Sequence, residues 1–259
     1  PKRKGKEIRE VVRVPDGYVL VSNDLGQIEA RCLAMESLDP EVIRQFVDSS
    51  YDIHMDWAHK LAAAYPAVMR NFTGMEHFRS AVKNEFVFPA FYGAGVKKIS
   101  RLTGIPENKL YPLFEEFWEQ FAGVKKWQKK QLDLYQANGY VESLLGYRRY
   151  GPLKYNMILN TGPQSLGSDI CVEAAVKMFD EYLKTGEEWW VPIGNIHDDL
   201  LYVVPKSEMD RFRPVCIRNT IVSPHPFVSV VPLTCDFEEG QDWAHMEKTG
   251  SYRSDQLAA

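Results

Sequence analysis

The chain has 259 residues, of which 45% are hydrophobic and 25% are charged, and its formal net charge is −4. This is the composition of a globular protein with a full core, and no uninterrupted apolar stretch reaches the length of a membrane span. The acidic balance argues against a simple cationic DNA binder. Four scattered cysteines without a CxxC pair indicate neither a zinc site nor a disulfide framework, so a reducing, intracellular setting is expected.

The first predicted strand follows a polar arm that ends near residue 16. A Pro-Asp-Gly turn signal at 15–17 precedes an apolar run at 19–21, which leads to Asp24, and helical spacing begins at Ile28. The pattern predicts a strand that ends at an acid, followed by a helix. A carboxylate at that place can hold a metal ion or merely cap the helix, and the pattern alone leaves both functions open.

Helical spacing continues from residue 27 to about 65, interrupted at Asp39-Pro40 and at Tyr51-Asp52. In the next segment, 76–93, Arg79 and Lys83 are four positions apart and therefore share one face of a helix. Two cations on one face can hold a triphosphate, or they can simply be an exposed basic face.

The middle of the chain is basic. Residues 79–155 contain 13 Lys and Arg against 7 Asp and Glu, whereas the remainder of the chain contains 18 against 28. This distribution suits a protein that contacts phosphates over one face, although solvated lysines explain part of it. Within this region we predict one long amphipathic helix over 111–138 and a strand pair over 140–150.

A second acidic stretch lies at 193–204, where two apolar runs flank His197, Asp198 and Asp199. The pattern predicts a hairpin with adjacent acids at its turn. A divalent cation shared with Asp24 would offset the repulsion between the acids, whereas an ordinary acidic turn is the alternative. A final strand and turn are expected within 224–242, and the polar tail beyond Met246 is expected to be disordered.

Three stretches together resemble the family A DNA polymerases, the group of bacterial DNA polymerase I and related phage and mitochondrial replicases. Residues 24–31, DLGQIEAR, are similar to the family's DYSQIELR, and residues 196–199, IHDD, are similar to its VHDE. Between them, the family pattern R-xxx-K-xxx-F-xxx-YG is echoed by Arg79, Lys83, Phe88, Tyr92 and Gly93. Three motifs in the same order are a specific signal, whereas any one alone would be weak.

The resemblance implies template-directed DNA synthesis, in which a primer 3′-hydroxyl attacks the α-phosphorus of a bound dNTP with the help of two Mg²⁺ ions. The implied catalytic acids are Asp24, Asp198 and Asp199, and the implied metal ligands are Asp24, Asp198 and the carbonyl of Leu25. The implied dNTP-binding residues are Gln27, Glu29, His54, Arg79, Lys83, Phe88 and Tyr92. The implied primer–template contacts are Arg148, Arg149, Asn160, Gln164 and His197.

Two positions depart from the family pattern. Phe88 lies five residues after Lys83, where the family has four, and a one-residue bulge in the helix would reconcile the two registers. Asn156 stands where some members carry an arginine, which puts one primer contact in doubt.

The implied fold class is α+β: a polymerase palm, made of an antiparallel sheet backed by helices, with a helical fingers subdomain. The expected division is 1–54 for the N-terminal part of the palm, 55–140 for the fingers and 141–259 for the C-terminal part of the palm. Because the sequence begins with Pro and holds nothing that could supply a thumb or an exonuclease, it is expected to be the C-terminal portion of a longer polymerase or one part of a split one.

The expected partners are primer–template DNA, dNTPs and the missing thumb and exonuclease portion or a second polypeptide, with no membrane. The expected location is the cytoplasm of a bacterial or phage-infected cell, or an organelle. Two other functions stay open: a single-subunit RNA polymerase-like enzyme, against which Glu29 argues because the family uses this residue to exclude a 2′-hydroxyl, and a non-catalytic nucleic-acid-binding remnant of a polymerase.

Overall fold

A computed structural model describes residues 6–257 of the chain. The chain divides into two compact units, one built from residues up to Ala30 and from Leu166 onward, the other running from Arg31 to Ser165. Within the described residues no helix is both long enough and apolar enough to cross a bilayer.

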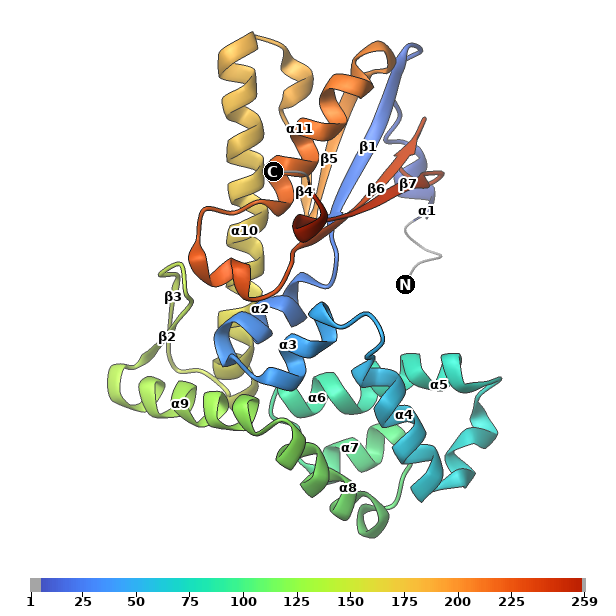
Figure 1. The fold of residues 1–259 in the computed structure, drawn as a ribbon, viewed down its shortest axis with the longest axis vertical. Helices are drawn as coiled ribbons and strands as arrows, with labels where there is room; N and C mark the ends of the chain where they lie inside the picture. The colour runs from blue at the N-terminus through green and yellow to red at the C-terminus, as the bar shows by residue number, and fades with distance from the viewer. Residues whose placement is uncertain (1–5, 258–259) are drawn as a thin grey trace. The chain divides into compact units, whose positions relative to one another are not determined.

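The first unit is organised around an antiparallel sheet whose described strands follow the order β4-β5-β1-β6-β7 (Figure 1). Its strands are β1 (Tyr18–Leu25), β4 (Gly194–Ile196), β5 (Asp199–Pro205), β6 (Thr234–Gly240) and β7 (Glu247–Arg253). Its helices are α1 (Lys6–Glu10), α11 (Met209–Ile221) and the C-terminal part of α10 (Tyr155–Thr185). Short 3₁₀ turns occur at Glu188–Trp190, Lys206–Glu208, Pro226–Val230 and Ser254–Gln256.

Helix α11 covers one face of this sheet. Successive side chains of a strand point to opposite faces, so Asn23 of β1 faces away from its neighbours Ser22 and Asp24. The Asn23 amide is fully buried and donates to Thr220 Oγ1 at 2.6 Å and to Cys216 Sγ at 3.2 Å, both on α11. The opposite face carries Ser22 and Asp24, and it is the face on which the acids gather.

The second unit is helical apart from one hairpin. Its helices are most of α2 (Ile28–Ser37), then α3 (Pro40–Val47), α4 (Ile53–Ala64), α5 (Met75–Val82), α6 (Phe88–Phe91), α7 (Val96–Thr103), α8 (Glu107–Gln120), α9 (Ala122–Asn138) and the start of α10. A 3₁₀ helix at Pro66–Asn71 and a π-helix, η2 (Lys83–Val87), complete the helical elements that the structure describes here. Strands β2 (Tyr140–Glu142) and β3 (Arg148–Tyr150) form the hairpin.

An aromatic core holds the second unit together. Phe117 is fully buried and lies 5.1 Å from the Trp57 ring, 5.2 Å from the Phe86 ring and 4.7 Å from the Phe121 ring, measured between centroids. Such contacts add stability beyond simple burial of area. Phe117 and Phe121, which belong to the segment 111–138, are therefore core residues.

Most predicted elements are confirmed, but the single helix over 111–138 is wrong. The chain breaks at Phe121 between α8 and α9 because Asp39, distant in sequence, caps the second helix. Asp39 Oδ2 accepts from the Val124 amide at 3.0 Å, while its Oδ1 accepts from the Glu41 amide at the start of α3 at 3.0 Å. One buried carboxylate thus caps the N-terminal ends of two helices.

The predicted disorder beyond Met246 is also wrong for the residues that the structure describes. Strand β7 pairs with β6, and its polar side chains find partners there: Lys248 Nζ and Ser251 Oγ each lie 2.7 Å from a carboxylate oxygen of Asp236. A polar strand at the edge of a sheet lacks the apolar alternation that would reveal it in the sequence.

Candidate active site

Acidic side chains from three strands gather on the open face of the first unit's sheet. Asp24 of β1 pairs directly with Asp199 of β5 on one side and with Asp236 of β6 on the other. The pKa of Asp24 is raised to about 7, first by burial and then by the charges of Asp198, Asp199, Asp236 and Glu238, in that order. The two acidic stretches of the sequence therefore meet in one place, as the resemblance implies.

The turn of the β4–β5 hairpin brings Asp198 to the end of β1. His197 and Asp198 form the two-residue turn, and His197 adopts a left-handed backbone with φ of 61°. The Leu25 amide donates to the Asp198 carbonyl at 3.0 Å. This bond joins the residue after Asp24 to the turn, so the predicted hairpin with acids at its turn is confirmed.

Asp199 is held on the same face. Ser22 Oγ donates to Asp199 Oδ1 at 2.7 Å. Burial raises the pKa of Asp199, the Ser22 hydrogen bond lowers it in part, and the charge of Glu238 raises it again. An acid whose charge is disfavoured by burial and by like charges is stabilised by any cation that binds beside it.

The donors at this place fit a hard divalent cation. The predicted ligands Asp24, Asp198 and the carbonyl of Leu25 would supply oxygen atoms alone, which Mg²⁺ prefers. Across residues 6–257, no three His, Cys, Asp or Glu side chains are arranged as a complete metal site. Mg²⁺ is commonly bound by one or two carboxylates, with water and substrate phosphate completing its shell, so two carboxylates are sufficient.

In the second unit, α4, α5 and the start of η2 bring together the predicted cations and the histidine. Asp52 caps α4 through the His54 amide at 2.9 Å and pairs with the Arg79 guanidinium, whose Nε and Nη2 both lie 2.6 Å from Asp52 Oδ2. The pKa of His54 is lowered to about 4, first by burial and then by the charges of Lys83 and Arg79. His54 is therefore a neutral imidazole at pH 7.

The π-helix η2 resolves the register of this motif. The Phe88 amide donates to the Lys83 carbonyl five residues earlier, so the extra residue is absorbed in one wide turn. Lys83 Nζ lies 5.4 Å from the centroid of the Phe88 ring, which is 5.6 Å from His54 and 6.5 Å from Tyr92. The bulge expected from the spacing is confirmed, and π-bulges of this kind are frequent at functional sites.

The remaining predicted residues are more scattered. Arg148 and Arg149 lie on β3, where Arg148 pairs with Glu142 at 2.7 Å and Arg149 Nη1 lies 3.5 Å from Thr161 Oγ1. Asn160 and Gln164 are one turn apart on α10, while Gln27 is exposed just before α2 and Glu29 lies in its first turn. These placements leave their roles as predictions.

Sequence reasoning missed several residues beside the predicted ones. Ser22, Asp236 and Glu238 share a face with Asp24 only because of the strand pairing. The alternation of Asp236 and Glu238 with buried Cys235 and Phe237 was a readable signal of a strand with one acidic face.

The sequence of the chain is similar to those of known DNA polymerases. The family described as DNA polymerase family A matches residues 1–245. The chain is 28% identical over 250 residues to the thermostable DNA polymerase I of Thermus thermophilus and 28% identical over 254 residues to the DNA polymerase I of Deinococcus radiodurans. Each match covers 92% of this chain, but 28% of the first relative and 25% of the second, so the chain spans about a quarter of their length.

A solved structure supports the fold. The chain matches the POL domain of Pol1 from M. smegmatis, in complex with a DNA primer-template and dNTP, with a TM-score of 0.75 and 22% identity. The match covers 93% of this chain and 42% of that one. The antiparallel sheet backed by helices is therefore a polymerase-domain fold, and with the family match over nearly its whole length, the chain belongs to DNA polymerase family A.

Proposed function

We propose that the chain catalyses template-directed DNA synthesis, transferring a nucleotide from a dNTP to a primer 3′-hydroxyl. The observation that carries this proposal is the convergence of Asp24 with the 198–199 turn on one face of a sheet. Acids so placed suit two Mg²⁺ ions bound through Asp24, Asp198 and the Leu25 carbonyl. Such ions, when bound, neutralise phosphoryl charge and make the hydroxyl a better nucleophile.

The chain's own residues supply the rest of the reaction. Asp199, which accepts a hydrogen bond from Ser22, would add a further negative charge beside the two metal-binding acids. Arg79 and Lys83 would hold the triphosphate and stabilise the charge that develops on the leaving pyrophosphate. Neutral His54 can donate a hydrogen bond to a phosphate oxygen without adding a third cation to this face.

Positioning and selectivity follow from neighbouring groups. Phe88 and Tyr92 would pack beside the nascent base pair, and Gln27 would contact the dNTP. Glu29 would close the space beside the sugar C2′, so that a ribonucleotide is rejected. Arg148, Arg149, Asn160, Gln164 and His197 would contact primer and template. In this proposal the sheet with its helices is the palm, within 1–54 and 141–259, and residues 55–140 are the fingers.

The experiment is primer extension on a primed template with Mg²⁺ and either dNTPs or NTPs. Extension with dNTPs that is lost in Asp198→Ala supports the proposal, and loss of a metal-binding carboxylate should slow the reaction by roughly 10³-fold or more. Preference for NTPs would indicate an RNA polymerase-like enzyme. DNA binding without extension by the unaltered chain would indicate a non-catalytic remnant.

A further inference from the structure

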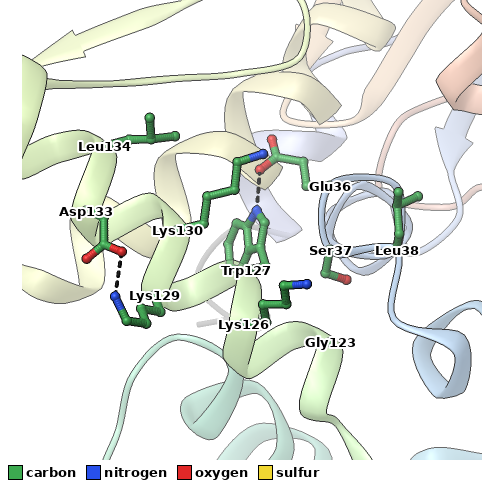
Figure 2. Close-up of a pocket in the computed structure, with 10 residues that line it drawn as sticks. All are labelled: Glu36, Ser37, Leu38, Gly123, Lys126, Trp127, Lys129, Lys130, Asp133 and Leu134. Atoms are coloured by element: carbon green, nitrogen blue, oxygen red, sulfur yellow. Dashed lines mark hydrogen bonds and ion pairs between the residues drawn. The ribbon is translucent and has the colours of Figure 1, made fainter.

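A cavity of about 830 Å³ lies within the second unit, between the end of α2 and the length of α9 (Figure 2). Its volume falls in the range of sites that bind ligands. The residues that line it are Glu36, Ser37, Leu38, Gly123, Lys126, Trp127, Lys129, Lys130, Asp133 and Leu134. None of them has a role in the proposed polymerase reaction.

The cavity offers apolar contact from both of its walls. Leu38 at the end of α2 is 60% exposed, and Leu134 on α9 is 41% exposed. Trp127, in contrast, is buried, and it is the one aromatic residue among the described residues that line the cavity. The walls therefore suit an apolar side chain, but they present no free aromatic face on which a nucleobase could stack.

Lysines line the α9 wall of the cavity. Lys126 and Lys130 are one helical turn apart on α9 and share a face. Neither forms an ion pair with any residue in the part of the chain that the structure describes, whereas Lys129 is paired with Asp133 at 2.6 Å. Lys126 thus remains to attract a negatively charged occupant, and Lys130 does so as well where the Glu36 carboxyl group beside it is protonated.

The α2 wall contains a buried carboxyl group with an unmet hydrogen bond. Glu36 Oε2 accepts from the Trp127 indole nitrogen at 3.1 Å, but Glu36 Oε1 is buried and has no partner within the described residues (Figure 2). A side chain at Gly162 would collide with this carboxyl group, so α10 closes off that side. Both carboxyl oxygens lie beside Gly162, so this group forms the closed end of the cavity.

We propose that this cavity is a docking site for a short acidic peptide of a partner protein, one that carries at least one large apolar side chain. The carboxylates of such a peptide would pair with Lys126 and Lys130, and its apolar side chain would lie against Leu38 and Leu134. A nucleic acid fits less well, because the cavity has apolar walls and offers no exposed aromatic face on which a base could stack. The proposal goes beyond polymerase activity and does not rest on it.

The test uses the full chain and fluorescein-labelled octapeptides, measured by fluorescence anisotropy. Each peptide of the panel consists of aspartate and glutamate residues and one leucine, isoleucine, phenylalanine or tryptophan. The position of that apolar residue varies from peptide to peptide. A neutral panel replaces the acids by asparagine and glutamine, and a ten-residue thymidine oligonucleotide represents nucleic acid. The variants are Lys126→Gln/Lys130→Gln and, independently, Leu134→Ser. The matched control is Lys97→Gln/Lys98→Gln on α7, two exposed lysines outside the cavity.

We expect at least one acidic peptide to bind, with about tenfold weaker binding in Lys126→Gln/Lys130→Gln and less than twofold change in the control, since each exposed charge pair contributes modestly. Leu134→Ser should weaken the same peptide, and added salt should as well. The proposal is overturned if no acidic peptide binds, if the neutral peptides bind equally well, or if Lys126→Gln/Lys130→Gln binds the acidic peptide as tightly as the unaltered chain. It is also overturned if the oligonucleotide displaces the peptide and shows the same dependence on Lys126 and Lys130.

Discussion

The buried carboxyl group of Glu36 makes a quantitative prediction about stability and pH. Burial raises the pKa of Glu36 above its ordinary 4.5, the Trp127 hydrogen bond and the charge of Lys130 offset part of that rise, and the resulting pKa is about 7. Between these two pKa values the folded protein holds a proton that the unfolded chain releases. The free energy of unfolding therefore falls as pH rises through this window and levels off above about pH 8.

The substitution Glu36→Gln removes the titrating group but keeps the size of the side chain and an oxygen atom that accepts the hydrogen bond from the Trp127 indole. The pKa difference corresponds to roughly 3 kcal/mol once both states are ionised. Glu36→Gln should thus change stability little near pH 4.5 and should be more stable than the unaltered protein by about 2–3 kcal/mol at pH 8. Other titrating groups are common to both proteins, so the difference between them isolates Glu36.

The assay is urea unfolding of both proteins at several pH values between 4.5 and 8.5, followed by circular dichroism. Glu119→Gln is the matched control, because Glu119 is exposed on α8 and its difference from the unaltered protein should stay flat. A difference for Glu36→Gln that is also flat, or that shrinks as pH rises, would refute the account of Glu36 as a buried and disfavoured anion.

Three further predictions concern the described contacts. Burial and the neighbouring cations lower the pKa of His54 to about 4, so between pH 6.5 and 4 the unfolded chain takes up a proton that the folded protein does not, and the free energy of unfolding falls by roughly 3 kcal/mol in full. His54→Gln should remove this pH dependence, which unfolding at pH 4.5 and at pH 7 measures. Deletion of Asn84 should convert the π-turn into an ordinary α-helical turn and turn Lys83 away from Phe88, while the fold survives. The KM for dNTP should then rise about tenfold or more, and an unchanged KM would count against the assigned register. Gly26→Ala should cost about 1–2 kcal/mol because its methyl group meets the Thr234 hydroxyl, and Thr234→Ala should restore much of that loss in the double variant.

Local patterns predicted the elements that carry the site. The strand at Asp24, the hairpin at Asp198 and the hairpin over 140–150 all follow from apolar runs bounded by turn residues. The π-turn was predictable for a different reason, since the family spacing and the observed spacing differ by one residue and only a wide turn keeps Lys83 and Phe88 on the same face.

The elements that sequence reasoning missed depend on contacts between distant residues. The break at Phe121 requires the Asp39 carboxylate, which is 85 positions from the amide it caps. Strand β7 is stabilised by ion pairs and hydrogen bonds to Asp236 rather than by apolar alternation. The cavity at Glu36 likewise arises from the packing of α2 against α9, and nothing in either segment alone indicates it.

The most direct measurement of the central claim is Mn²⁺ binding by electron paramagnetic resonance, with a primer-template ended by a dideoxynucleotide and the matching dNTP present. Asp24 and Asp198 are proposed to share two cations. The unaltered chain should then bind two Mn²⁺ ions beyond those taken up by the nucleotide and DNA alone, and Asp24→Asn or Asp198→Asn should lose at least one of them. Unchanged stoichiometry and affinity in both variants would contradict the assignment of these carboxylates as the metal-binding pair.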